Sequence, residues 1–220
     1  MTHVVHPFAH RLGGIRNWKS SWTFSKSDYQ NFLKGDFLVR EFLTKELEKF
    51  YVSTISFERD GEKKYIIAIR TSRPGMIIGR EGDGIQKLIK KIKVILKKNN
   101  LSIPKEIKID IQDVHSPDSD AGILIAQIIE GLEKRMPFKR MQKMTAEKTM
   151  ANRDVKGVRI SLAGRLNGAD MARTEHVKLG SIPLSTFRAD VDYREGRANL
   201  PYGVIGVKVW IYKGEVFDKK

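Results

Sequence analysis

The chain of 220 residues contains no cysteine, which excludes disulfide bonds, thiolate metal sites and a cysteine nucleophile. It also lacks long apolar stretches. The longest runs, such as Ile123–Ala126, are far shorter than the roughly 20 residues that a membrane-spanning helix needs. Residues Met1–Arg16 contain no apolar core of the kind found in secretory signals, so we expect no signal peptide. These absences suit a protein of a reducing compartment that does not enter a membrane.

Acidic residues are scarce compared with basic ones. The sequence has 41 lysines and arginines against 26 aspartates and glutamates, which leaves a formal net charge of +15 and a pI near 9.9. Such an excess attracts a polyanion, either nucleic acid or an anionic membrane surface. Because no apolar segment suits a membrane, we expect a nucleic-acid partner. The length allows one large domain or two small ones, each with its own core.

Residue patterns typical of enzymes and metal sites are absent too. No Ser-His-Asp, H-E-x-x-H or G-x-x-x-x-G-K-[ST] pattern occurs in the sequence. His3, His6 and His10 lie close together, but no carboxylate or cysteine is near them and Pro7 interrupts the group. We therefore predict no catalytic residues, no bound metal, no cofactor and no small-molecule substrate.

The most informative segment is the glycine-rich stretch 73–89. Gly79 and Gly82 flank Arg80 and Glu81, between a short apolar segment and a lysine-rich one. Glycines allow backbone N–H groups to approach a sugar-phosphate chain closely, and the N-terminus of the following helix adds donors and partial positive charge. The glycine spacing is the reverse of the dinucleotide-binding fingerprint. Two interpretations remain for the loop alone: an ordinary turn before a surface helix, or the nucleotide-backbone clamp of a KH domain.

The order of the surrounding elements favours the KH domain. The periodicity predicts a helix over 36–50 and two strands over 52–57 and 63–71, joined at Asp60-Gly61. A helix–G-x-x-G–helix segment follows, with its second helix over 84–98, and a closing strand covers 107–111. Asp36 is the expected N-cap of the first helix. This order is that of a type II KH domain. We thus predict an N-terminal arm over 1–35 that becomes ordered on a partner, a KH domain over 36–113 and a C-terminal domain over 114–220.

The helix after the loop carries six lysines and has no acidic residue after Asp83. Such lysines would repel one another unless a phosphate backbone lay against them, although a solvated helix face is the ordinary alternative. From the loop and this helix we predict six RNA-binding residues: Gly79, Arg80, Gly82, Lys87, Lys90 and Lys91.

The second half of the chain predicts two helices and a sheet. Asp118 or Ser119 is the expected cap of an apolar helix over 121–132, and Pro137 restarts a second helix. The junction between these helices is basic. In the last predicted strand, Lys208 and the aromatic residues Trp210 and Tyr212 share one face. This face could contact RNA, but we favour a helix that packs over Trp210.

Three stretches of this half resemble a known family. Residues 157–175, 182–193 and 202–215 are similar to the C-terminal domain of ribosomal protein S-three of the bacterial small subunit, and the KH segment and the arm (Pro7, Arg11, Trp18, Trp22) agree with it. The resemblance implies an α+β fold, with a type II KH domain followed by two helices on a mixed or antiparallel sheet. It also implies a structural, ribosome-bound protein in the head of the subunit that holds rRNA and lines the entrance of the mRNA channel, assisting mRNA binding and unwinding.

The resemblance further implies partners and site residues. The neighbours would be ribosomal proteins S-ten and S-fourteen, with S-two nearby, and the compartment would be the cytoplasm or an organelle matrix. The predicted mRNA contacts are Lys134, Arg135, Lys139, Arg140 and Lys143, and the rRNA-binding candidates of the C-terminal domain are Arg159, Arg165, Arg173, Lys178 and Arg188. Glu81 in the clamp and Pro137 at the helix junction depart from the family pattern. The alternative function is that of a free KH-domain regulator that binds mRNA away from the ribosome.

Overall fold

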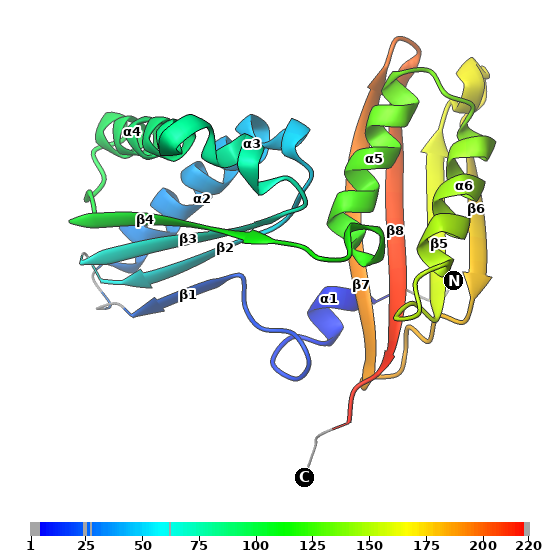
Figure 1. Ribbon diagram of the computed structural model, residues 1–220, viewed down its shortest axis with the longest axis horizontal. Coiled ribbons are helices and arrows are strands. Elements are labelled where there is room, and N and C mark those ends of the chain that lie inside the picture. Colours follow the sequence, from blue (N-terminus) through cyan, green and yellow to red (C-terminus); the bar gives the residue numbers. More distant parts are fainter. Residues whose placement is uncertain (1–4, 24–25, 27, 62, 218–220) are drawn as a thin grey trace. The chain divides into compact units, whose positions relative to one another are not determined.

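The computed structural model describes residues 5–23, 26, 28–61 and 63–217. They form two compact units. The central unit is Trp18–His115, and the terminal unit combines the described parts of Met1–Asn17 and Ser116–Lys220. Each unit places helices on a four-stranded sheet (Figure 1). The predicted α+β class is therefore confirmed.

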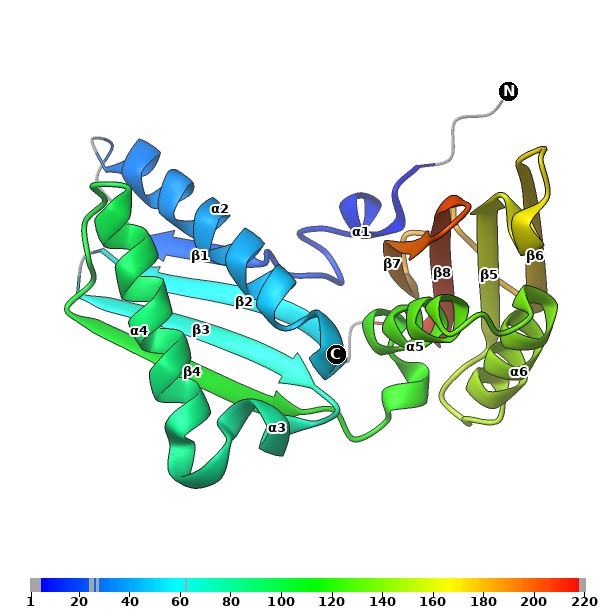
Figure 2. The same cartoon turned by 90° about the horizontal axis from the view of Figure 1, so that it is seen from above.

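The sheet of the central unit has the order β1-β2-β3-β4, where β2 and β3 are antiparallel and the outer pairs are parallel. Figure 2 shows α2 and α4 side by side on one face of this sheet. The elements are β1 Ser20–Thr23, α2 Tyr29–Glu46, the 3-10 turn η1 Glu48–Phe50, β2 Val52–Asp60, β3 Lys64–Thr71, α3 Pro74–Ile78, η2 Arg80–Gly82, α4 Asp83–Lys98 and β4 Glu106–Asp113. The predicted hairpin and the helix–G-x-x-G–helix segment are confirmed, and the parallel β3–β4 pair requires the long crossover through α3 and α4.

The first helix of this unit differs from the prediction. It begins at Tyr29 rather than near residue 36, and Asp36 is not its cap but a buried residue within the helix, 3% exposed. The Asp36 Oδ1 lies 3.0 Å from an Arg59 guanidinium nitrogen, and the Trp22 indole N–H donates to Oδ2 at 2.6 Å. Burial raises the pKa of the Asp36 carboxyl, and the Arg59 charge opposes that change. The signal for a cap was misleading because the partner of Asp36 lies on a strand, distant in sequence.

Residues 1–35 do not form a single arm. The helix α1 Pro7–His10 belongs to the terminal unit, whereas β1 and the start of α2 belong to the central unit. Trp22 packs within that unit, its ring 5.8 Å from that of Tyr29, but Trp18 is 70% exposed. Packing within the protein therefore accounts for Trp22 but not for Trp18.

Arg11 anchors α1 to the terminal unit. Its guanidinium is buried and donates hydrogen bonds to backbone carbonyl oxygens of Ala189 (2.5 Å), Pro7, Leu184 and Thr186 (each 3.0 Å). A buried charge is tolerated when its donors are all satisfied. The docked position of α1 is therefore held by carbonyl dipoles of a segment about 175 residues away in sequence.

The sheet of the terminal unit has the order β6-β5-β8-β7 and is antiparallel throughout. Its elements are η3 Pro117–Ser119, α5 Ala121–Glu133, α6 Phe138–Met150, β5 Gly157–Gly164, η4 Leu166–Gly168, β6 Arg173–Gly180, β7 Ala189–Leu200 and β8 Gly203–Glu215. Asp120, rather than Asp118 or Ser119, caps α5, because its carboxylate accepts the N–H groups of Gly122 and Ile123.

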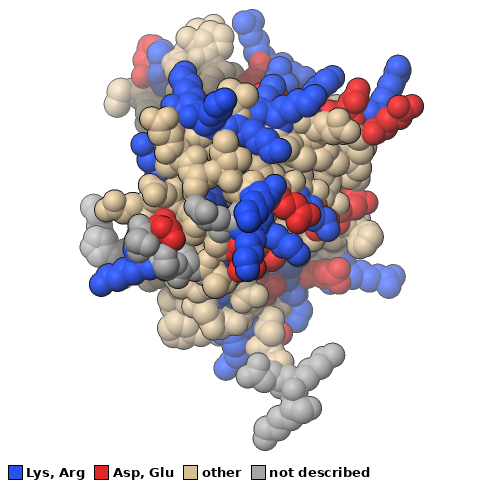
Figure 3. Space-filling model, turned by 90° about the vertical axis from the view of Figure 1, so that its left-hand side faces the viewer, with Lys and Arg blue, Asp and Glu red and all other residues tan. Residues whose placement is uncertain are grey.

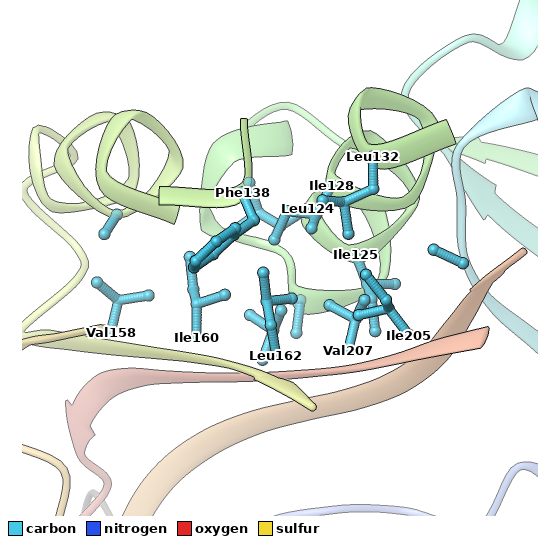
Figure 4. Packing of buried hydrophobic residues seen from close by; sticks show 14 of the residues in the cluster. Leu124, Ile125, Ile128, Leu132, Phe138, Val158, Ile160, Leu162, Ile205 and Val207 are labelled. Carbon is cyan, nitrogen blue, oxygen red and sulfur yellow. The ribbon is translucent and has the colours of Figure 1, made fainter. Parts of the chain in front are cut away.

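The two helices of this unit cover one face of the sheet. Figure 4 shows Leu124, Ile128 and Phe138 pointing toward Ile160 and Val207 of the sheet. These side chains are all buried and apolar, which agrees with the period of two residues along the strands and with the helical period along α5. No helix of the described chain is both long and apolar enough to span a bilayer.

The other face of the same sheet holds Trp210. The predicted helix packing over this ring is wrong: Trp210 forms a small cluster with Val191 and Tyr212, covered by Ile182 and Leu184. The two aromatic side chains are mostly buried, so the cluster supports the sheet rather than offering a stacking surface for RNA.

Candidate nucleic-acid interface

The G-x-x-G loop is built from residues with left-handed backbone conformations. Gly79, Glu81 and Gly82 have φ angles of 73°, 52° and 84°, and α4 begins directly afterwards at Asp83. The Gly79 N–H bonds to the Gly75 carbonyl at 3.0 Å and ends α3. Glycine adopts positive φ without steric cost, whereas Glu81 does so as a non-glycine residue held in the turn.

A third glycine, Gly84, brings the two helices of this segment together. A Cβ at this position would lie 2.8 Å from the Ile78 carbonyl oxygen and still closer to that of Ile77. Gly84 lies within the stretch 73–89, but the sequence alone predicted no role for it. The structure shows that only glycine permits this close approach of α3 and α4, which fixes the loop conformation.

The loop presents an exposed anion-binding geometry. Gly79 and Arg80 are exposed, and no side chain from the described residues caps the first turn of α4. Free N–H groups at a helix N-terminus, together with the helix dipole, favour a phosphate. The exposed Glu81 carboxylate beside them is unfavourable for an anion, so Arg80 and the lysines of α4 must supply the attraction.

The lysine-rich face of α4 is solvent-exposed along its whole length. Leu88, Ile92 and Leu96 are buried on the sheet side. All six lysines (Lys87, Lys90, Lys91, Lys93, Lys97 and Lys98) are exposed. Figure 3 shows basic side chains gathered in the upper part of the view, over α4. Although α4 itself has no acidic residue after Asp83, Lys91 pairs with an acidic residue of another helix, Glu46 of α2, at 2.5 Å. The other five form no ion pair with any described residue.

The helix junction of the terminal unit exposes a second basic group. Arg135 and Met136 donate backbone hydrogen bonds to the carbonyls of Leu132 and Gly131 and end α5, with Arg135 in a left-handed conformation (φ 60°). Pro137 precedes the first residue of α6, which confirms its predicted role as the restart of a helix.

The five predicted mRNA contacts differ in their partners. Lys134 pairs with Glu130, and the Lys143 Nζ lies 3.9 Å from the Glu147 Oε1. Arg135, Lys139 and Arg140 are exposed and form no ion pair within the described part of the chain. These three cations are therefore the ones most available to an RNA phosphate.

The rRNA-binding candidates are spread over the terminal unit instead of forming one patch. Arg165 donates to the carbonyls of Ala169 (2.9 Å) and Tyr202 (3.3 Å), so it joins two loops. Arg159 is half-buried, with its guanidinium 5.2 Å from the centroid of the Trp210 ring. Both therefore have structural contacts that the sequence did not reveal.

The remaining three candidates lie at the surface. Arg173 lies 3.0 Å from the Glu175 Oε1, and Arg188 lies 2.6 Å from the Glu215 Oε2. Lys178 is exposed and has no ion-pair partner among residues 5–217 that the structure describes. Their role in RNA binding stays a prediction, since exposed pairs of this kind can exchange a carboxylate for a phosphate.

The N-terminal histidines have other contacts. His6 accepts the Ala9 N–H and caps α1, and His10 stacks on Phe187 with 3.9 Å between ring centroids. His3 lies outside the described residues. Within those residues no three histidine, aspartate or glutamate side chains are placed to hold a metal ion.

Comparison with known proteins covers the whole chain. The KH domain family matches residues 38–119, and the family described as "Ribosomal protein S3, C-terminal domain" matches residues 128–211. A protein of Lawsonia intracellularis named "Small ribosomal subunit protein uS3" is 42% identical over 221 residues, spanning 100% of this chain and 99% of that protein. The chain belongs to this ribosomal protein family.

Other relatives carry the same name. The protein from Baumannia cicadellinicola is 40% identical over 218 residues, covering 99% of this chain and 90% of its own length, and that from Blochmanniella floridana is 42% identical over 219 residues. The family is one of structural, non-enzymatic proteins. The predicted resemblance and the prediction that the chain is not an enzyme are therefore both confirmed.

Proposed function

We propose that this chain is a structural constituent of the small ribosomal subunit and binds rRNA through the G-x-x-G loop and α4. The observation that carries this proposal is the exposed loop, with its positive-φ residues at the N-terminus of α4 and five lysines along the same helix that pair with no described residue. The loop offers backbone donors to a phosphate, and the lysines extend the positive field along an RNA backbone. Membership of the family supports the ribosomal setting.

A second part of the proposal concerns mRNA. Arg135, Lys139 and Arg140, with Lys134 and Lys143 beside them, would contact the mRNA at the entrance of its channel and help to separate paired strands. They would do so by binding the single strand, without nucleotide hydrolysis. The support is their exposure at one helix junction and the absence of ion pairs for three of them among the described residues.

The partners would be those of the subunit head. We propose rRNA, mRNA and the neighbouring proteins S-ten, S-fourteen and S-two, in the cytoplasm or an organelle matrix. Arg173, Lys178 and Arg188 are exposed enough to reach rRNA, while Arg159 and Arg165 would act by positioning strands and loops.

Sucrose-gradient sedimentation of a native extract, after a salt wash, tests the ribosomal assignment. We expect the chain to co-migrate with small subunits in a one-to-one ratio. Recovery only at the top of the gradient would contradict the proposal and favour the free mRNA-binding regulator.

The mRNA contacts require a functional test. Replacing Lys139, Arg140 and Lys143 with alanine in assembled subunits should slow translation through stable hairpins, with little effect on unstructured mRNA. Lys148→Ala is a matched control, because this lysine lies on the same helix but pairs with Asp118 at 2.8 Å. Equal rates for the triple variant and the control would reject the mRNA role.

A further inference from the structure

A cavity of about 380 Å³ opens at the junction of α5 and α6 in the terminal unit. Its floor consists of the buried apolar residues Leu132, Phe138 and Ile205, and its rim consists of the exposed residues Arg135, Asn167 and Tyr202. Its volume lies within the range of small-ligand sites, of about 300–1,000 Å³. The apolar floor and the polar rim of this cavity together suit a ligand that is flat and partly polar.

The wall that carries Tyr202 is held by defined contacts. Arg165 donates to the Tyr202 carbonyl at 3.3 Å and to the Ala169 carbonyl at 2.9 Å, which links the β7–β8 turn to the loop after β5. Gly168 has a φ of 77°, and a Cβ there would lie 3.4 Å from the Tyr202 ring. The ring therefore rests on Gly168, yet Tyr202 remains 63% exposed.

Among the described residues, Arg135 is the single charged side chain that lines the cavity. None of the residues that line it is acidic, and Arg135 lies on its rim in a left-handed conformation that few non-glycine residues adopt. Lys139 and Arg140 follow the lining residue Phe138 directly, within the first turn of α6. A ligand in the cavity would thus have Arg135 on its rim and two further exposed cations in the first turn of the adjoining helix.

We propose that this cavity takes one unstacked nucleobase of a single-stranded RNA. Tyr202 stacks on the base, the Asn167 amide pairs with its polar edge, and Arg135, Lys139 and Arg140 bind the flanking phosphates. Aromatic stacking of splayed bases beside a basic surface is the usual way in which proteins hold single strands. The inference rests on the proposed contact between this junction and RNA, and it adds a base-binding site to it.

The site would distinguish unpaired from paired RNA. A base within a duplex is stacked and paired, so it cannot enter the cavity without the cost of leaving the helix. A base held on Tyr202 is in turn unavailable for pairing. The cavity therefore favours the separated strand, whereas the surface cations alone would attract both forms.

Photo-crosslinking of the purified full-length chain tests this site. The probe is a uridine hexamer with one central 4-thiouridine, and the crosslinked peptides are identified by mass spectrometry. We expect a crosslink within 200–205 or 166–168, reduced about 5-fold or more by Tyr202→Ala, the loss expected for one base–aromatic stack. Tyr202→Phe, which keeps the ring, should retain the crosslink, and the same probe in a duplex should not form it.

A second variant and an affinity measurement guard against misfolding. Met136→Trp should fill the cavity without removing a charge and should weaken the crosslink as Tyr202→Ala does, at an unchanged melting temperature. Crosslinks confined to the central unit, with fluorescence anisotropy still showing binding that depends on the α4 lysines, would overturn the base site and leave the proposed function standing. Absence of RNA binding in every arm would overturn both.

Discussion

Among the described residues, each unit of this protein buries one arginine, and the two are satisfied by different chemistry. Arg59 in the central unit pairs with the Asp36 carboxylate and lies over the rings of Tyr65 and Phe32, with its guanidinium carbon 4.3 and 4.6 Å from their centroids. Arg11 in the terminal unit instead donates to backbone carbonyls. Both fasten a segment of the first 36 residues to its unit. The difference is that Arg59 pairs directly with a carboxylate, whereas the hydrogen bonds of Arg11 go to carbonyl dipoles and the nearby charges of Asp190 and Arg16 act on it only through space.

The largest expected effect comes from leaving one charge of the pair alone. Asp36→Leu should lower the free energy of unfolding by about 3–5 kcal/mol, because Arg59 would remain buried without a counter-charge. Adding Arg59→Met should restore most of the loss, since an apolar pair needs no compensation. Urea denaturation of the three proteins measures both changes. If the double variant were as unstable as the single one, the pair would act through its shape or hydrogen bonds and not through charge.

Removing the other buried arginine should cost less. Arg11→Met leaves several carbonyls without donors but no uncompensated charge, so we expect a loss of about 2–3 kcal/mol. Hydrogen exchange should accelerate at the start of β7, where Ala189 accepts from Arg11. Arg11→Lys keeps the charge but has fewer donors, so its free energy of unfolding should lie between those of the parent protein and Arg11→Met. If Arg11→Met lowered the free energy of unfolding more than Asp36→Leu does, the carbonyl contacts of Arg11 would contribute more to stability than the ion pair of Arg59.

A smaller effect distinguishes the lysines of α4. Lys90 has no ion-pair partner among the described residues, whereas Lys91 pairs with Glu46. Lys90→Gln should reduce the salt dependence of single-stranded RNA binding by about 0.7 in the slope of log K against log salt concentration. Lys91→Gln should reduce it less, because part of that charge is already neutralised. Equal slopes for both variants and the parent would indicate that this helix face is only solvated.

The smallest expected effect is that of an exposed pair on α6. The Lys143 Nζ and Glu147 Oε1 are 3.9 Å apart and both side chains are largely exposed, so Lys143→Gln should change the free energy of unfolding by no more than about 0.5 kcal/mol. Thermal melts in low and high salt measure it. A change comparable with that of Arg11→Met would mean that surface pairs matter here as much as buried cations.

Several features of the chain could be predicted from local patterns alone. The alternation of Val158, Ile160 and Leu162 placed these residues on the buried face of a strand, and the Asp60-Gly61 turn identified the hairpin. Likewise, Gly79 and Gly82 identified the loop. These signals are readable because side-chain periodicity and positive φ depend on residues close together in sequence.

Only the tertiary structure decided how distant residues meet. It divided residues 1–35 between two units, made Asp36 the partner of Arg59 instead of a cap, and brought Arg11 within 2.5 Å of the Ala189 carbonyl, 178 positions away. The cavity beside Tyr202 likewise combines three separate segments of the terminal unit. Local pattern determines which face of an element is buried, but the partner on that face depends on how the elements pack, so these contacts could not be read from the sequence.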